Sequence, residues 1–394
     1  MKQMAITIVF TFISVICLAQ NTTPKYEIHE TPETKIFNVH SLNKIKLGSC
    51  YNGVFAVFDE VYSKNYIFSK AGQLLGEVQS YELIHFFDGE YAKNKIFKGD
   101  HYAAPIIKTD GSVINDTGAY HIQISDVQNG AFLLHKDEKL FFVDLKNNIK
   151  HTVSTKRSDD DATVFGPGID GRHLYKNRFG KYGYISENGT LSIPAQFESA
   201  YDFSEGVAAV YDDNTGLWGY IDVNGTYVIP PTFSNPVSSF HDGYGVVCKK
   251  NSARVYINKS GEQVSPEYSY ALDFCDGYAW TWESNKAIVS IIDTSFNAVK
   301  GLSDYEISWY SVRGYSRLVS VNTYLRNTHG GSYNQIYTIN GDLLLSQKFP
   351  NSLNLAGELI EYIICEGYST NTIKERGYIN ENGEVIIKFI KSEF

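Results

Sequence analysis

The feature that most constrains this fold is self-similarity along the chain. A turn glycine, preceded by Phe-x-x in four of nine copies, returns at intervals of 34 to 43 residues from Gly53 to Gly357. A second glycine lies between these in most units, and three successive copies, Gly189, Gly225 and Gly261, are spaced by 36 residues. Repetition in this range is typical of solenoids, propellers and arrays built from one supersecondary unit. The sequence therefore predicts about nine copies of a single unit.

The chemistry of the unit indicates β structure. Asn-Gly and Asp-Gly pairs recur, and such pairs favour tight hairpin turns because they accept positive φ. Between the turns lie runs of about five residues rich in Val, Ile, Tyr and Phe, the length of an ordinary strand. No window shows a sustained helical period. Each unit is predicted to hold three or four short antiparallel strands, with turns at Gly189, Gly206, Gly225, Gly243, Gly261 and Gly277.

One stretch carries a recognisable motif. Leu217-Trp218-Gly219-Tyr220-Ile221 is followed by Asn224-Gly225, by Ile229-Pro230 and by Phe233, while Phe203 to Val210 supplies a Phe-x-x-Gly-x-Ala-x-Val run. This pattern resembles the WG-repeat family of bacterial proteins. The resemblance is strong from about Gly180 to Gly277 and worn on either side, and only Trp218 keeps the signature tryptophan. It implies a repeat module of secreted or surface proteins, without catalytic residues or a defined ligand to carry over.

The repeats can close into a ring or stack in a line, and the termini favour the ring. The last unit is expected to stop one strand short, whereas Lys35 to Leu47 is a strand-like stretch outside any unit. Pairing that stretch with Glu384 to Ile390 removes two exposed edges, which are an aggregation hazard. We therefore expect a β-propeller-like ring in preference to an open β-solenoid, although nine units exceed the usual four to eight.

The N-terminus has the pattern of a secretory signal. Lys2 precedes an apolar stretch from Ala5 to Leu18, and Cys17-Leu18-Ala19 forms a small-x-small cleavage site. The expected organisation is a signal peptide over 1–19, an N-terminal segment with the closing strand over 20–52, and the repeat array over 53–394. We expect export to the periplasm, the cell surface or the medium, with no membrane span.

Four cysteines remain after that cleavage. These cysteines are Cys50, Cys248, Cys275 and Cys365. In an oxidising compartment they allow three disulfide pairings, including one that joins the first and last units. The alternative is that they are buried free thiols.

Composition excludes several classes of ligand. A net charge of −9 and a pI near 5.6, without any basic run, argue against a nucleic-acid partner. Gly166 to Gly171 matches G-x-G-x-x-G, but no helix is expected after it, so a loop is favoured over a dinucleotide site. Asp159 to Asp161 and Asp212 to Asn214 are read as solvated hairpin tips rather than Ca²⁺ sites. Neither a cofactor nor a metal is expected.

The candidate binding residues are aromatic. Trp280 and Trp282 alternate around Thr281 and should share one strand face, and Trp309 with Tyr310 follow one unit later. Such residues suit a protein or glycan partner, whereas packing between neighbouring units is the competing explanation. The leading hypothesis is an exported, non-catalytic binding or scaffold protein. The alternative is a carbohydrate-active hydrolase with paired carboxylates in a central channel.

Overall fold

The computed structural model describes most of the chain between Glu27 and Lys391. The described residues are 27–50, 52–86, 90–94, 96–97, 102–103, 105–115, 131–136, 139–144, 149–154, 163–177, 179–186, 191–283, 288–303, 308–315, 318–324, 332–348, 351–366 and 372–391. The predicted signal peptide lies outside them. Within them no helix is long and apolar enough to cross a membrane.

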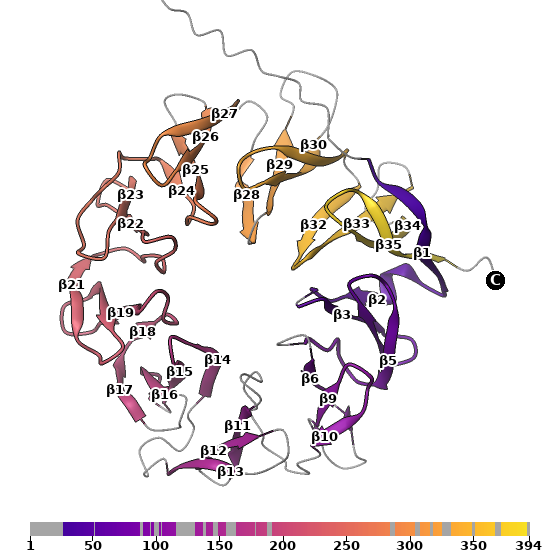
Figure 1. Cartoon of the computed structure of the whole chain (residues 1–394), viewed down its shortest axis with the longest axis horizontal. Coiled ribbons are helices and arrows are strands. Elements are labelled where there is room, and N and C mark those ends of the chain that lie inside the picture. The colour runs from indigo at the N-terminus through magenta and orange to yellow at the C-terminus, as the bar shows by residue number, and fades with distance from the viewer. Residues whose placement is uncertain are drawn as a thin grey trace, which may run out of the picture.

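Short β-sheets follow one another around a ring (Figure 1). After the 3₁₀ turn η1 (Leu42–Lys44), the first sheet contains β2 (Ile45–Leu47), β3 (Val54–Asp59), β4 (Lys64–Ser69) and β5 (Leu74–Gln79). Next come β6 (Tyr91–Lys93), β9 (Ile106–Lys108) and β10 (Val113–Asn115), with the small pair β7 (Ile96–Phe97) and β8 (Tyr102–Ala103). The third sheet contains β11 (Ala131–Lys136), β12 (Lys139–Asp144) and β13 (Ile149–Ser154).

Two four-stranded sheets occupy the part of the ring with the clearest motifs. The first contains β14 (Thr163–Ile169), β15 (Arg172–Lys176), β16 (Tyr182–Ser186) and β17 (Leu191–Phe197). The second contains β18 (Ser199–Ala200), β19 (Val207–Asp212), β20 (Leu217–Asp222) and β21 (Tyr227–Phe233). A two-stranded sheet follows, made of β22 (Gly245–Cys248) and β23 (Arg254–Ile257).

Three larger sheets complete the ring. The first contains β24 (Tyr270–Ala271), β25 (Tyr278–Glu283), β26 (Ile288–Asp293) and β27 (Ala298–Ser303). The second contains β28 (Ser308–Tyr315), β29 (Leu318–Tyr324), β30 (Ser332–Thr338) and β31 (Leu343–Lys348). The last contains β32 (Ser352–Ala356), β33 (Leu359–Cys365), β34 (Ile373–Ile379) and β35 (Glu384–Lys391), with β1 (His29–Val39) added beside β35.

The predicted all-β, propeller-like ring is confirmed, but its units are less uniform than the repeat suggests. Among the described residues, six sheets have four or five strands and the others have two or three. Beside β23, the segment after Ile257 pairs only through two isolated bridges, Ile257 with Gln263 and Arg254 with Tyr268. Pro266 lies between those bridges and has no N–H to donate, so a regular outer strand is interrupted there.

The geometry of β20 and β21 explains the motif of the repeat. Trp218 pairs with Phe233 and Tyr220 pairs with Ile229, so the intervening Gly219 faces several residues of a bulged partner strand. A Cβ on Gly219 would lie 2.7 Å from the Ile229 carbonyl oxygen. The glycine of the motif is therefore required by close approach of the neighbouring backbone, and the Ile-Pro run forms the bulge that approaches it.

In three consecutive sheets the tyrosine of the motif bonds to the segment that follows. The buried Tyr184 hydroxyl donates to the Tyr201 carbonyl (2.7 Å), Tyr220 donates to Ser238 (2.7 Å), and Tyr256 donates to Leu272 (2.6 Å). In each case the acceptor lies in the following sheet or leads into it. Burial raises the pKa of all three phenols, so these hydroxyls remain protonated donors.

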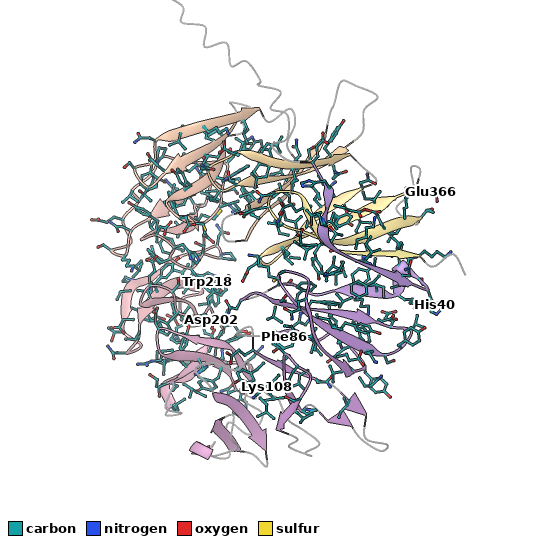
Figure 2. The ribbon with its side chains drawn as sticks, turned by 45° about the vertical axis from the view of Figure 1, so that its right-hand side comes forward. His40, Phe86, Lys108, Asp202, Trp218 and Glu366 are labelled. Atoms are coloured by element: carbon teal, nitrogen blue, oxygen red, sulfur yellow. The ribbon has the colours of Figure 1, made fainter. Side chains whose placement is uncertain are left out.

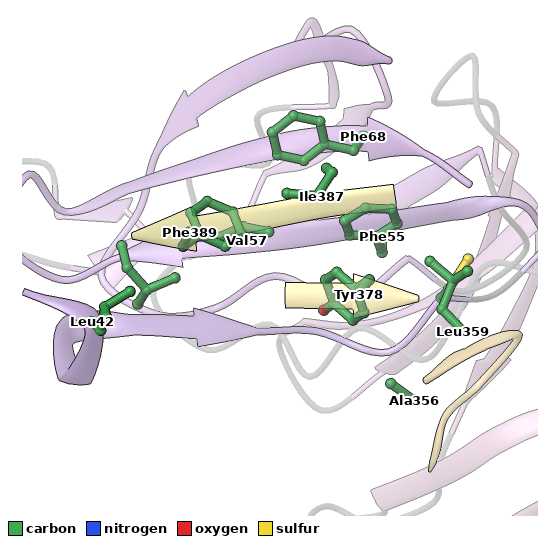
Figure 3. Packing of buried hydrophobic residues seen from close by; sticks show 11 residues of the cluster. Leu42, Phe55, Val57, Phe68, Ala356, Leu359, Tyr378, Ile387 and Phe389 are labelled. Atoms are coloured by element: carbon green, nitrogen blue, oxygen red, sulfur yellow. The ribbon is translucent and has the colours of Figure 1, made fainter. Parts of the chain in front are cut away.

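The ring is closed by contacts between its first and last sheets. β1 pairs in parallel with β35, placing Lys35 beside Ile387 and Phe37 beside Phe389. Figure 3 shows the shared core, in which Phe55 and Phe68 of the first sheet pack with side chains of the last. The buried Tyr378 hydroxyl donates to the Gly48 carbonyl, which repeats the tyrosine contact found between consecutive sheets.

The closing strand differs in detail from the prediction. The last sheet lacks no strand, because Ser352–Ala356 forms its first one, and β1 is an additional fifth strand. Only the front part of the predicted segment pairs with β35, since Ile45–Leu47 pairs with β3 instead. Closure is therefore made by a parallel outer strand together with a packed interface.

The turn glycines and cysteines are assigned as follows. Positive φ is found at five of the six predicted turn glycines, Gly206, Gly225, Gly243, Gly261 and Gly277, while Gly189 lies outside the described residues. No disulfide joins the four described cysteines, Cys50, Cys248, Cys275 and Cys365. Cys50 is buried in the closure interface, where burial raises the pKa of its thiol to about 12.

Candidate functional site

The antiparallel order of the strands gives the ring two different faces. Turns from first to second strand and from third to fourth strand lie on one face, which we call the glycine face. Turns from second to third strand, and the segments leading into the next sheet, lie on the opposite face, which we call the linker face. In the sheet β18–β21, Gly206 and Gly225 lie in the two turns of the glycine face. Gly216 lies in the turn between the second and third strands, on the linker face.

The glycine face is occupied by contacts between neighbouring sheets. The backbone N–H of Gly206 donates to the Asp170 carboxylate (2.6 Å), Gly243 to Glu205 (3.1 Å), and Gly277 to Asp242 (2.8 Å). The same contact crosses the closure, where Gly53 donates to Glu358 at 3.2 Å. The carboxylates of these turns are thus used to hold the ring together.

The linker face carries exposed aromatic side chains. Tyr62 lies between β3 and β4, Tyr81 follows β5, and Phe179 lies between β15 and β16. Their exposed fractions are 53%, 57% and 63%, among the largest of any apolar residue in the described chain. Large exposed rings at turn positions are available for contact with a ligand, whereas the motif tyrosines are buried. The linker face is therefore the candidate functional surface.

Trp280 and Trp282, two of the residues predicted to bind a partner, do not form this surface. Trp280 is fully buried, its indole N–H donates to the Ile339 carbonyl (2.7 Å), and its ring meets Tyr337 edge-on at 5.5 Å. Trp282 is partly buried against the same cluster. Assigning Trp280 to a binding surface was wrong, because the shared strand face turns toward the next sheet. Trp309 and Tyr310 lie on β28, but their side chains are outside the described residues.

The exposed residues of the linker face were missed by sequence reasoning. The signal for them is weak: Val61-Tyr62 and Phe179 are apolar residues at turns, where polar residues are usual. Repeat periodicity does not single them out, since no equivalent ring recurs in every unit.

The acidic segments behave as hairpin tips where they are described. The Asp212 carboxylate accepts from the Asn214 N–H (3.0 Å), and Asp213 pairs with Lys181. No group of three metal-ligating side chains occurs among the residues that the structure covers. Asp159 to Asp161 lie outside them. Gly166 to Gly171 spans β14 and the turn into β15, so it has no helix N-terminus to hold a phosphate.

Comparison with a family model settles what the repeat is. The model described as "WG containing repeat" matches residues 182–215, 218–252, 256–286 and 377–390. The chain contains WG repeats. The first three matched segments cover the strong part of the motif, and the last covers the end of β34 and most of β35, at the point where the ring closes.

Solved structures match much of the chain at low sequence identity, and one of them has a TM-score above 0.5. A eukaryotic initiation factor structure has a TM-score of 0.55 at 11% identity, covering 80% of this chain and 90% of that one. A computationally designed protein, Ika8, covers 79% and 98% with a TM-score of 0.43 at 10% identity. BamB from Moraxella catarrhalis covers 73% and 96% with a TM-score of 0.39 at 8% identity. No curated protein sequence matches the chain.

Proposed function

We propose that this WG-repeat ring is an exported, non-catalytic binding or scaffold protein of the cell envelope or exterior. The observation that carries the proposal is that the two faces of the ring expose different kinds of side chain. The most exposed aromatic rings, Tyr62, Tyr81 and Phe179, lie on the linker face, whereas the exposed apolar residues beside glycine-face turns are mainly aliphatic, such as Leu74 and Val113. A rigid ring that displays exposed aromatic side chains suits recognition, because such side chains offer apolar area and hydrogen-bond handles.

Export is supported by the sequence alone. Lys2, the apolar stretch to Leu18 and the small residues around Ala19 have the pattern of a secretory signal. N-terminal sequencing of protein recovered from the producing cell should find Gln20 as the first residue. Recovery of a chain that retains Met1 would contradict export by signal cleavage.

Binding is tested with the mature protein, residues 20–394. The immobilised ring is exposed to envelope extract and to a glycan array, and each captured species is purified and titrated against the ring. Saturable binding without turnover supports the proposal. The hydrolase alternative has no specific observation in its favour among the described residues. Release of new reducing ends from a bound glycan would nevertheless replace the binding proposal with the hydrolase.

A further inference from the structure

Two exposed tyrosines of the linker face lie at one end of the first sheet. Lys64 pairs with Gln79 across β4 and β5, and the Ser80 N–H donates to the Ser63 carbonyl one step further on (2.9 Å). Tyr62 and Tyr81 are the next residues beyond this bonded pair, so both leave the sheet at the same end, where the left-handed Ser63 (φ +49°) ends the regular pairing. His40 adds a third ring, 6.0 Å from Tyr62 between centroids, at the periphery of the ring of sheets (Figure 2).

The backbone beneath these rings is held by buried polar side chains. The Asp59 carboxylate accepts from the Val61 N–H at 2.8 Å, which fixes the turn that carries Tyr62. The Asn65 amide donates to the Glu82 carbonyl (2.9 Å) and accepts from the Ile84 N–H (3.1 Å), which fixes the segment after Tyr81.

The Ser80 hydroxyl also donates to the Glu82 carbonyl at 2.9 Å. Asp59, Asn65 and Ser80 are three of the seven buried polar residues in the described chain. Buried polar groups are costly unless fully hydrogen-bonded, so their concentration here indicates a turn and a linker held in one conformation. Preorganisation of this kind lowers the entropy lost when a ligand binds.

The size of the exposed area limits the class of ligand. An aromatic side chain offers about 150–250 Å², so two tyrosines that are just over half exposed present on the order of 200 Å². A stable protein interface needs about 800 Å² per partner. A patch of this size matches one or two sugar rings, whose flat C–H faces stack on aromatic rings.

The charges around Tyr62 and Tyr81 further limit the class of ligand that can bind there. Lys44 and Lys46 both pair with Glu60, at 3.1 and 2.5 Å, and Lys64 pairs with Glu77 at 2.9 Å. Three lysines share two carboxylates here, and Lys44 and Lys46 are more than half exposed, so solvent screens the one unbalanced positive charge and an anionic saccharide gains little from it. The arrangement favours a neutral saccharide.

We propose that Tyr62 and Tyr81 form a stacking platform for a neutral saccharide, with His40 and the phenol hydroxyls hydrogen-bonding to its hydroxyl groups. This inference rests on the proposed binding function and assigns it a ligand class and a place. It places the ligand-binding site at the first sheet, next to the ring closure.

The test is titration of the mature ring with neutral hexasaccharides of β-linked glucose, β-linked N-acetylglucosamine and α-linked mannose. At least one should bind, and Tyr62→Ala and Tyr81→Ala should each weaken that binding at least tenfold. Tyr62→Phe should retain most of it, because the ring remains. Tyr227→Ala removes an exposed ring of β21, on a distant sheet and outside the linker-face set; it is the matched control and should bind like the wild type.

Absence of binding to all three hexasaccharides, or equal binding by both alanine variants, would overturn the platform. If the ring instead captures an envelope partner saturably, and Tyr62→Ala and Tyr81→Ala do not weaken that binding, the platform is overturned. The proposed binding function then remains intact. Cleavage of a bound hexasaccharide would instead overturn the non-catalytic proposal, even if both tyrosines prove necessary for binding.

Discussion

At the scale of single residues, the glycines of the repeat serve two separate physical requirements. Gly219 must be small because the bulged strand opposite lies within 2.7 Å of its missing Cβ. Gly225 and Gly206 instead have φ of +84°, a conformation that other residues resist. Gly225 also faces Ile193 of the preceding sheet at 3.3 Å, whereas nothing lies within 4 Å of a Cβ on Gly206.

This difference separates backbone strain from packing between sheets. Gly206→Val should cost about 1–3 kcal/mol of unfolding free energy through strain alone. Gly225→Val should cost more, because the added side chain also displaces Ile193. Urea denaturation of the two variants measures both. Equal destabilisation would show that the turn does not press against the neighbouring sheet, and an unchanged midpoint for Gly225→Val would show that no tight turn exists there.

The buried hydroxyl at the closure should contribute to stability. Tyr378→Phe removes the donor to the Gly48 carbonyl and leaves that buried oxygen unsatisfied, at a cost of about 1–3 kcal/mol. Tyr62→Phe, which removes a hydroxyl from an exposed ring, should leave the unfolding free energy within about 0.5 kcal/mol. If both variants unfold at the same denaturant concentration as the wild type, the tyrosine contact across the closure is not formed.

Cys50 provides a pH-dependent test of the same interface. Its pKa of about 12 in the folded chain exceeds its ordinary value of 9.0, so the folded state holds the thiol proton more tightly. The associated stability is present below pH 9.0 and is lost as the pH rises toward about 12. At pH 9, iodoacetamide should therefore modify Cys50 far more slowly in native protein than in urea. Equal rates by peptide mass spectrometry would contradict its burial.

At the scale of secondary-structure elements, the positions of strands were predictable from the sequence. The surfaces against which their side chains pack were not. The Asn-Gly turns and the Val-rich runs located β19, β20 and β21 correctly, since these patterns are local. The alternation of Trp280 and Trp282 correctly indicated one strand face. It could not indicate that this face is covered by β29 and its neighbours, because that depends on how sheets pack around the ring.

The strand β1 offers a test at this scale. Deletion of residues 21–39 removes the parallel partner of β35 and the Phe37 ring, which stacks on Phe389 at 5.5 Å. Amide hydrogen exchange over Glu384–Lys391 should then accelerate, because the edge of β35 becomes exposed. Exchange over Val207–Asp212, on a distant sheet, is the internal control and should not change. Unchanged protection of β35 would show that β1 does not cover it.

At the scale of the whole molecule, the period of the repeat predicted a closed array but not its irregularities. Some units lack one of the two turn glycines, and Pro266 interrupts the outer strand of another, so the sheets differ in size. Each unit needs only enough strand pairing to pack on its neighbours. The closure required contacts between residues more than 300 positions apart, which no local pattern reports. The aromatic residues of the linker face were likewise unpredictable, because exposure at one turn is a property of the assembled ring.

Closure is the central claim, and zero-length carbodiimide cross-linking tests it directly on the unmodified chain. Lys70 and Glu358, from the first and last sheets, lie 3.1 Å apart, and Lys388 pairs with Glu30 of β1. The local pairs Lys44–Glu60 and Lys64–Glu77 serve as internal controls. A closed ring predicts that peptide mass spectrometry finds the Lys70–Glu358 and Lys388–Glu30 links within single chains, verified by mixing isotopically light and heavy protein. Formation of the local links without the two long-range ones would contradict the ring.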